Sequence, residues 1–313
     1  MGCKVTVFLR GGLGNQMFQY ALGLNLAKKN NSELFLDATF LNDRFPRKEF
    51  TYRTFDLDIF TLSPSKILSD KIWDGEPRFT AFSKISKTVP VPGVWLGLDL
   101  ACMKACDIFG LRKIIKEKEE FRFDQNVLSA KGNVVLYGRW QSEKYFADNA
   151  LDVRRAFRFR QKLSGEAASL AERIENSNSV SIHVRRGDYV NFENMKKITG
   201  GTDLSYYAQA VSYIAERIPE PHFFIFSDDI AWCRENLKIP FPVIYCDEKT
   251  AGPKNAFHLE LMSLCKYNII TNSTFSWWGA WLNANLRKIV VAPKRWFSIA
   301  ENNDTVPSSW VRI

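Results

Sequence analysis

The chain has few of the residues that build metal clusters or disulfide frameworks. Its 313 residues include three histidines and six cysteines, and the cysteines are scattered along the sequence. Cys102 and Cys106 stand four positions apart, but no second pair of ligands lies near them. Reduced thiols are therefore favoured over a zinc site.

Long apolar runs are also missing. No stretch of about 18 apolar residues occurs, which argues against a membrane-spanning helix. The apolar run at residues 5–9 is too short for the core of a signal peptide. We therefore expect a cytoplasmic protein without a transmembrane segment.

The charge is unbalanced, with 43 Lys and Arg against 34 Asp and Glu, a formal net charge of +9. Such an excess suits nucleic acid, an anionic membrane surface or a negatively charged small substrate. A basic nucleic-acid-binding protein is a rival hypothesis, but no RNP, helix-turn-helix or zinc-finger spelling occurs and the basic residues are spread along the chain. We expect no nucleic-acid partner, while peripheral association with the inner face of a membrane remains compatible with the charge.

The hydrophobic pattern predicts an α/β protein with two doubly wound, Rossmann-like domains. The length exceeds one usual core, so two domains of about 150 residues are expected, with boundaries at 1–155 and 156–313. The first 37 residues read as strand, glycine-rich turn, helix and strand. After residue 156 short apolar strands alternate with helices, which is typical of a parallel sheet buried on both faces. Strands are predicted at 4–9, 33–36, 134–137, 180–184, 223–226, 243–245, 267–271 and 289–292, and helices near 15–29, 206–217, 232–237, 256–265 and 275–285.

Two segments do not follow this alternation. Residues 51–122 contain scattered prolines and predict short helices and loops. Within them, Asp56-Leu57-Asp58 has the spelling of a metal-binding Asp-x-Asp, but its alternating setting favours a solvated strand. The last twenty residues, from Pro293, are expected to return to the N-terminal domain.

The most informative motif covers residues 183–188 (HVRRGD), at the end of an apolar strand. Ligands of open α/β sheets gather beyond the carboxyl ends of strands. An Arg guanidinium is always charged and offers a fork of donors for phosphate oxygens, so Arg185 and Arg186 suggest a diphosphate. The alternative is a surface ion pair between Arg186 and Asp188.

A second motif, residues 272–282 (NSTFSWWGAWL), begins a helix at another strand end. Thr274, Ser276 and the first-turn N–H groups suit phosphate oxygens, although taken alone the hydroxyls favour a simple Ser/Thr N-cap. Trp277, Trp278 and Trp281 are either core residues or a platform for a sugar or base.

The turn at Gly12-x-Gly14 lacks the third small residue of a dinucleotide fingerprint, because Met17 occupies that position. We prefer a turn that lets Asn15 and Gln16 approach acceptor and donor sugars. The alternative is a tight strand-to-helix connection with Asn15 as a cap.

Together, residues 11–21, 183–189, 204–207 with 223–229 (FFIFSDD), and 272–282 resemble the inverting α-1,2-fucosyltransferases that use GDP-fucose, bacterial type. The resemblance implies a GT-B-like fold with two domains facing across a cleft and a donor site in the C-terminal domain. It also implies a galactose-terminated oligosaccharide acceptor, metal-independent transfer with anomeric inversion, and no cofactor.

The resemblance also assigns roles to residues. Arg185 would hold the diphosphate, His183 would lie at the nucleotide, and Ser276 with its neighbours would cap the phosphates. Glu193 is a candidate base, with Asp37 as another. The catalytic candidates are Arg185, Asp188 and Glu193. The donor-binding candidates are Asn15, Gln16, His183, Arg185, Arg186, Asp229, Ser273, Thr274, Phe275 and Ser276.

One position departs from the pattern, since His258 stands where the family carries an acidic residue that reads guanine. Glu260 or Asp229 is a possible substitute.

Overall fold

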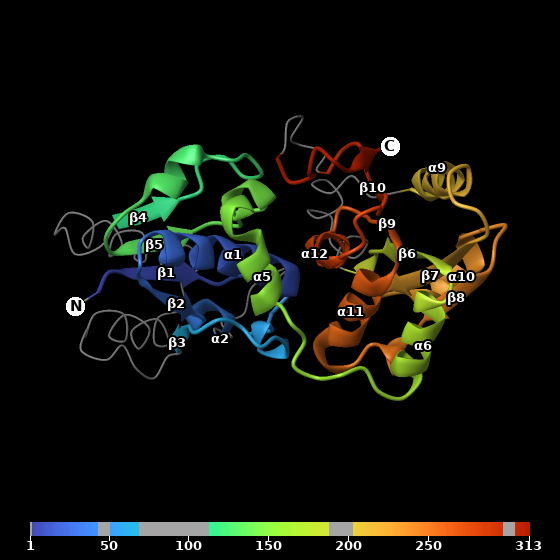
Figure 1. Cartoon of the computed structure of the whole chain (residues 1–313), viewed down its shortest axis with the longest axis horizontal. Helices are drawn as coiled ribbons and strands as arrows, with labels where there is room; N and C mark the ends of the chain where they lie inside the picture. Colours follow the sequence, from blue (N-terminus) through green and yellow to red (C-terminus); the bar gives the residue numbers. More distant parts are fainter. Residues whose placement is uncertain (1, 43–50, 69–112, 188–202, 297–303) are drawn as a thin grey trace.

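Two parallel β-sheets organise the chain. The computed structural model describes residues 2–42, 51–68, 113–187, 203–296 and 304–313 (Figure 1). The first sheet has the order β3-β2-β1-β5-β4 and the second the order β11-β10-β9-β6-β7-β8. Every strand pair described in the two sheets is parallel. The strands of the first sheet are β1 (Lys4–Phe8), β2 (Glu33–Asp37), β3 (Lys66–Leu68), β4 (Lys113–Lys116) and β5 (Val134–Tyr137). Those of the second are β6 (Asn178–Val184), β7 (Pro221–Ser227), β8 (Val243–Cys246), β9 (Tyr267–Ile269), β10 (Val290–Ala292) and β11 (Val311–Arg312).

The helices follow the strands as crossover connections, and Figure 1 shows the two sheets side by side with α12 between them. The described helices are α1 (Leu13–Lys29), α2 (Thr39–Asn42), α5 (Ala150–Ala156), α6 (Glu166–Glu175), α9 (Leu204–Ala215), α10 (Ile230–Asn236), α11 (Ala256–Leu264) and α12 (Thr274–Leu282). The predicted α/β fold with alternating strands and helices is confirmed.

The described parts of residues 51–122 differ from the prediction of short helices and loops in two ways. Strands β3 and β4 are edge strands of the first sheet, and neither was predicted from the sequence. They are only three and four residues long, and β3 begins with a lysine while β4 has one at each end, so they show little apolar periodicity. The predicted strand around Asp56 and Asp58 is wrong, because Leu57–Ile59 forms a 3-10 helix whose Leu57 and Ile59 are buried.

The final segment contacts both halves of the molecule. The Asp304 carboxylate accepts the backbone N–H of Phe123 at 2.8 Å and pairs with Lys144, so this part of the segment lies against the first half. The chain then returns, and β11 pairs with β10 in the second sheet. The segment therefore ties the end of the chain to both sheets.

Helix α1 is buried on nearly all sides, with 14 of its 17 residues buried. Gly23 packs against the first sheet, where an added Cβ would come within 2.3 Å of a Val7 methyl. At the start of the helix, Gly14 packs against α12, where an added Cβ would meet the backbone carbon of Thr274 at 2.5 Å. Since a side chain fits at neither position, the two glycines allow α1 to lie close to both the sheet and α12.

Each sheet has one point at which the chain reverses the direction of strand addition. In the second sheet β7 and β8 are added on one side of β6, and β9 to β11 on the other. In the first sheet the reversal lies between β1 and β5. Ligands of open α/β sheets bind at such points, beyond the carboxyl ends of the strands.

Candidate functional site

His183 lies near the carboxyl end of β6, at the reversal point of the second sheet. Its side chain is buried, and Nδ1 has no hydrogen-bond partner among the described residues. Burial, together with the charge of Arg185 and proximity to His258, lowers the pKa of His183 to about 3. The ring centroid lies 5.8 Å from that of Phe275, in the first turn of α12. A neutral imidazole therefore lies where two predicted motifs meet.

Arg185 follows β6 and is oriented by a carboxylate from the neighbouring strand. Its Nη1 lies 3.0 Å from Oδ2 of Asp228, just after β7. Oδ1 of Asp228 accepts the backbone N–H of Arg186 at 2.9 Å, so one carboxylate holds both the Arg185 side chain and the turn. An added Cβ at Gly187 would lie 2.5 Å from Asp228 Oδ2, which shows how closely the turn packs on the carboxylate. Asp228 was not predicted as a site residue, although the serine and paired aspartates ending the FFIFSDD segment were its signal.

Arg186 makes different contacts from its neighbour. Its Nε donates to Asp229 Oδ2 at 3.2 Å, and the guanidinium carbon lies 3.9 Å from the ring centroid of Trp232. Asp229 also caps α10, since its Oδ1 accepts the N–H of Trp232 at 3.0 Å. Protein groups thus hold both Arg186 and Asp229, and the predicted partner Asp188 lies outside the described residues.

The N-terminus of α12 carries the second motif. Ser273 is the N-cap residue and, within the described chain, makes no side-chain cap hydrogen bond. The Ser276 hydroxyl contacts backbone carbonyls, with Ser273 O at 3.1 Å and Thr271 O at 3.4 Å. It is directed into the protein and does not cap the first-turn N–H groups. Those groups and the helix dipole are the features of this turn that suit an anion.

The three tryptophans of α12 are core residues. Trp277, Trp278 and Trp281 are buried. Phe146 stacks on Trp278 with ring centroids 5.5 Å apart, and Trp278 Nε1 donates to the carbonyl of Gly14 at 3.0 Å. Their packing joins α12 to α1. The three tryptophans are therefore core residues and do not form a platform for a sugar or base.

The start of α1 lies against the start of α12 through the contact of Gly14 with Thr274. Asn15 is partly exposed there, and its Oδ1 accepts a hydrogen bond from Gln141 Nε2 at 2.7 Å. Gln16 is fully buried. Its amide bonds to the backbone of Gly11, Thr54 and Asp56 at 2.8–2.9 Å. Asn15 therefore pairs with Gln141 next to the contact of Gly14 with Thr274, whereas Gln16 supports the segment around residue 55.

His258 is a structural histidine in the described core. Its Nε2 lies 3.0 Å from Thr250 Oγ1 and 3.1 Å from the Asp247 carbonyl, and burial lowers its pKa to about 4. Two residues along α11, burial raises the pKa of Glu260 to about 7, and one of its carboxylate oxygens has no partner among the described residues. The side chain at 258 therefore faces the interior, and Glu260 carries a partly buried carboxylate with one oxygen that has no partner among the described residues.

The base candidates are placed unequally. Asp188 and Glu193 lie outside the described residues. Asp37 is buried at the end of β2, where Oδ1 accepts the backbone N–H of Thr39 at 3.0 Å and its hydroxyl at 2.7 Å. Both contacts are with the first residue of the short helix α2.

Two further features bear on the kind of protein. Within the described ranges, no group of three or more His, Cys, Asp and Glu side chains is arranged to hold a metal ion, and no helix has the length and apolar character needed to cross a membrane. The Asp56–Asp58 segment instead contacts Lys254, whose Nζ lies 2.7 Å from Asp58 Oδ1.

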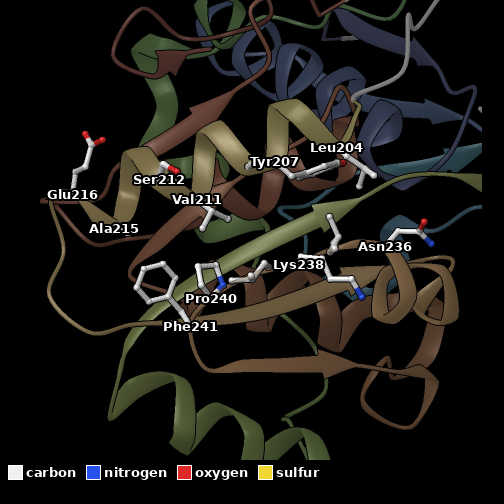
Figure 2. Close-up of a pocket in the computed structure, with 13 residues that line it drawn as sticks. Leu204, Tyr207, Val211, Ser212, Ala215, Glu216, Asn236, Lys238, Pro240 and Phe241 are labelled. Atoms are coloured by element: carbon white, nitrogen blue, oxygen red, sulfur yellow. The ribbon is translucent and has the colours of Figure 1, made fainter.

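A groove of about 630 Å³ runs between α9 and the connection from α10 to β8 (Figure 2). Its walls include Leu204, Tyr207, Val211, Leu237, Pro240 and Phe241. The candidate site residues that the structure describes all lie elsewhere.

At the reversal point of the second sheet, Arg185, a neutral histidine and an uncapped helix N-terminus lie together. Fixed positive charge beside free N–H donors suits the phosphates of a nucleotide. The start of α1, from the first half of the chain, approaches the same helix terminus. The arrangement can therefore bind an anionic ligand between elements of both halves.

Comparisons with known proteins find relatives of this chain. An α-1,2-colitosyltransferase of Escherichia coli is 36% identical over 313 residues, covering 99% of this chain and 98% of that protein. The O-antigen biosynthesis glycosyltransferase WbnK of Escherichia coli is 31% identical over 314 residues, covering 97% and 99%. Galactoside α-(1,2)-fucosyltransferase 2 of Gorilla gorilla gorilla is 36% identical over 106 residues, 33% of this chain and 30% of that protein.

Among solved structures, NodZ α-1,6-fucosyltransferase soaked with GDP-fucose superposes with a TM-score of 0.51 at 14% identity, covering 90% of this chain and 93% of that one. This likeness confirms the GT-B-like fold. The model of glycosyl transferase family 11 matches residues 4–313. With that match and two relatives similar over their full lengths, the chain belongs to glycosyl transferase family 11, the α-1,2-fucosyltransferase family.

Proposed function

We propose that this glycosyltransferase moves L-fucose from GDP-β-L-fucose to the 2-hydroxyl of a terminal galactose, with inversion at the anomeric carbon. The observation that supports it most is the meeting of two motifs at the reversal point of the second sheet. His183, two residues before Arg185, has its ring centroid 5.8 Å from that of Phe275 in the first turn of α12, whose N-cap residue makes no side-chain cap hydrogen bond within the described residues. The family supports a GDP-sugar donor and α-1,2 transfer.

The chemistry requires stabilisation of a leaving diphosphate. The galactose 2-oxygen forms a bond to the anomeric carbon as the bond from that carbon to the β-phosphate oxygen breaks, and GDP leaves with the bonding electrons. Negative charge grows on the β-phosphate, where the Arg185 guanidinium and the α12 N–H groups stabilise it. The acceptor proton passes to a base, for which Glu193 is our candidate, with Asp188 nearby in sequence.

The other site residues have supporting roles in this proposal. His183 stays neutral because its pKa is about 3, so it contacts the nucleotide without adding charge. Asp228 holds Arg185 in place, and Asp229 with Trp232 holds Arg186. The N–H groups of residues 274–276 receive phosphate oxygens, and Asn15 approaches from the first half of the chain.

Colitose is the second candidate for the transferred sugar. It differs from fucose by the absence of the 3-hydroxyl, and the relative that is 36% identical over almost the whole chain is an α-1,2-colitosyltransferase. A site that binds the 3-hydroxyl discriminates strongly against a sugar that lacks it, because its own polar groups are then unpaired.

The test compares the two donors with one acceptor. Purified protein is incubated with lactose and either GDP-fucose or GDP-colitose, with excess EDTA, and the trisaccharide is identified by mass spectrometry and linkage analysis. We expect an α-1,2-linked fucosyl product that EDTA does not abolish. If kcat/KM is higher with GDP-colitose, colitose is the transferred sugar and not fucose. If neither donor gives transfer to any galactoside, the proposal is overturned.

A further inference from the structure

The segment after β5 has a strained backbone that several contacts hold in place. Trp140 is fully buried and adopts a positive φ of 57°, which is unfavourable for a residue with a large side chain. The Glu117 carboxylate accepts the backbone N–H groups of Arg139 at 2.7 Å and of Trp140 at 3.1 Å. The Ser142 N–H donates to the Trp140 carbonyl at 2.8 Å and closes a tight turn around Gln141. Strain of this kind persists where the surroundings enforce it, and it is common at functional sites.

The turn places Gln141 at the reversal point of the first sheet, where β1 and β5 are neighbours. Gln141 is 3% exposed, and its Nε2 donates to Asn15 Oδ1 at 2.7 Å. Its Oε1 is buried and has no hydrogen-bond partner, so the contact with Asn15 is the one that this amide makes within the described residues.

Asn15 is thereby held through one end of its amide. Its Oδ1 faces Gln141, and its Nδ2 lies over Gly11, where an added Cβ would come within 2.4 Å of that nitrogen. Gly11 has a positive φ of 79° and no side chain, so the amide can approach the backbone here. Asn15 is partly exposed, and it directly follows Gly14, which packs on Thr274 at the start of α12.

We infer that Gln141 is a positioning residue that fixes which end of the Asn15 amide faces the substrate. This inference rests on the proposed function. In it, Nδ2 of Asn15 donates to an oxygen of a substrate, either a sugar hydroxyl of the acceptor or an oxygen of the sugar nucleotide. Gln141 acts only through Asn15. The network of Glu117, the Trp140 turn and Gln141 keeps this donor preorganised.

The central test is Gln141→Glu. A carboxylate can only accept, so the Asn15 amide must turn its Nδ2 toward residue 141 and present Oδ1 to the substrate. We expect kcat/KM to fall roughly ten- to a hundredfold, as for loss of one oriented hydrogen bond. Protonation of the introduced carboxylate restores a donor, so the activity of the variant relative to wild type should rise as the pH is lowered.

Two further variants separate positioning from mere support of the fold. Gln141→Met removes the donor at similar size and should reduce kcat/KM less than Gln141→Glu. Asn15→Asp keeps an acceptor for Gln141 but replaces the Nδ2 donor, and it should lose at least as much activity as Gln141→Glu. If the KM for GDP-fucose changes, the oxygen that Asn15 Nδ2 binds belongs to the sugar nucleotide. If the KM for lactose changes instead, that oxygen belongs to the acceptor sugar.

The outcomes distinguish this inference from the proposed function. The role of Gln141 is overturned if kcat/KM of Gln141→Glu lies within threefold of wild type. It is also overturned if the loss of activity only follows a lower melting temperature and the pH profile of activity is that of wild type. A wild-type protein that transfers neither fucose nor colitose overturns the proposed function itself, and this inference with it.

Discussion

Arg185 illustrates how one residue can combine two electrostatic roles. Its Nη1 pairs with Asp228 Oδ2 at 3.0 Å, and its side chain remains about one quarter exposed. The carboxylate limits the orientations of the guanidinium, and a quarter of the side chain is exposed to solvent. Asp228 follows β7, the strand next to β6, so the parallel register of the sheet brings the two residues together.

Replacing Arg185 tests the proposed leaving-group stabilisation. We expect Arg185→Ala to lower kcat by roughly 10³-fold or more, because the β-phosphate loses its fixed positive charge. Arg185→Lys keeps the charge but loses the planar fork and should recover part of the rate. Single-turnover kinetics with GDP-fucose measure this. Turnover of Arg185→Ala within tenfold of wild type would rule out the assigned role.

His258 makes the stability of the fold depend on pH. Its pKa is about 4 in the folded chain and its ordinary value is 6.5, so the folded state binds fewer protons than the unfolded state between those values. The stabilisation of the folded state by neutral, buried His258 is present above pH 6.5 and is lost as the pH falls toward 4. At a pH of about 5 this costs the folded state about 2 kcal/mol relative to neutral pH.

The matched comparison is His258→Gln, which places an uncharged side-chain amide near Thr250 and Asp247. We expect the free energy of unfolding of the variant to fall less than that of wild type between about pH 7.5 and about pH 5, by about 2 kcal/mol. Urea denaturation at both pH values measures the difference. The raised pKa of Glu260 acts in the opposite direction but is present in both proteins, so it largely cancels. Identical pH dependence in the two proteins would show that His258 is not the titrating group.

Among the elements of the fold, the contact between α1 and α12 depends on Gly14. The Thr274 backbone occupies the place of a Cβ, and Trp278 donates to the Gly14 carbonyl. Phe18, one turn further along α1, packs on Trp277 with ring centroids 4.4 Å apart. The two helices that begin at the candidate site are therefore joined along their first turns.

Gly14→Ala should separate these helix starts, because a backbone atom cannot move aside as a flexible side chain can. We expect the free energy of unfolding to fall by about 1–3 kcal/mol, with a larger relative loss of kcat/KM. Gly2→Ala is the control, since it adds the same methyl group where no described atom lies within 4 Å. Denaturation and steady-state kinetics are measured together. A Gly14→Ala protein as stable and as active as the control would contradict the close packing.

Across the molecule, Lys254 joins distant parts of the chain. It lies just before α11, and its Nζ contacts the Phe55 carbonyl at 2.6 Å and the Asp58 carboxylate at 2.7 and 2.8 Å. Lys254 and Asn255 both have positive φ values, so the backbone turns sharply where this side chain projects. The Asp56–Asp58 segment is thus bound by an ammonium group of the second half.

Lys254→Met should weaken this link. Because Lys254 and Asp58 are 34% and 52% exposed, solvent screening limits the expected loss to about 0.2–1 kcal/mol, decreasing at high salt. Lys66→Met removes another exposed pair, with Glu33, inside the first sheet and is the matched control. A double-mutant cycle with Asp58→Asn isolates the interaction. Strictly additive effects would show that the contact contributes nothing.

Local features of this protein could be predicted from its residues alone, because hydrophobic periodicity and turn residues are properties of short segments. The α/β alternation, the motif after β6 and the helix that begins at Thr274 were all predicted in this way. The two short edge strands β3 and β4 escaped prediction, since three or four residues carry too little periodicity.

The choice of partner for each site residue, by contrast, became visible in the folded molecule. Arg186 pairs with Asp229, Arg185 with Asp228, and Gln141 with Asn15, which is 126 positions away in the chain. These contacts depend on strand order, register and the packing of α1 against α12. No local pattern in the sequence encodes those long-range choices, because they arise from the burial of whole faces of sheets and helices.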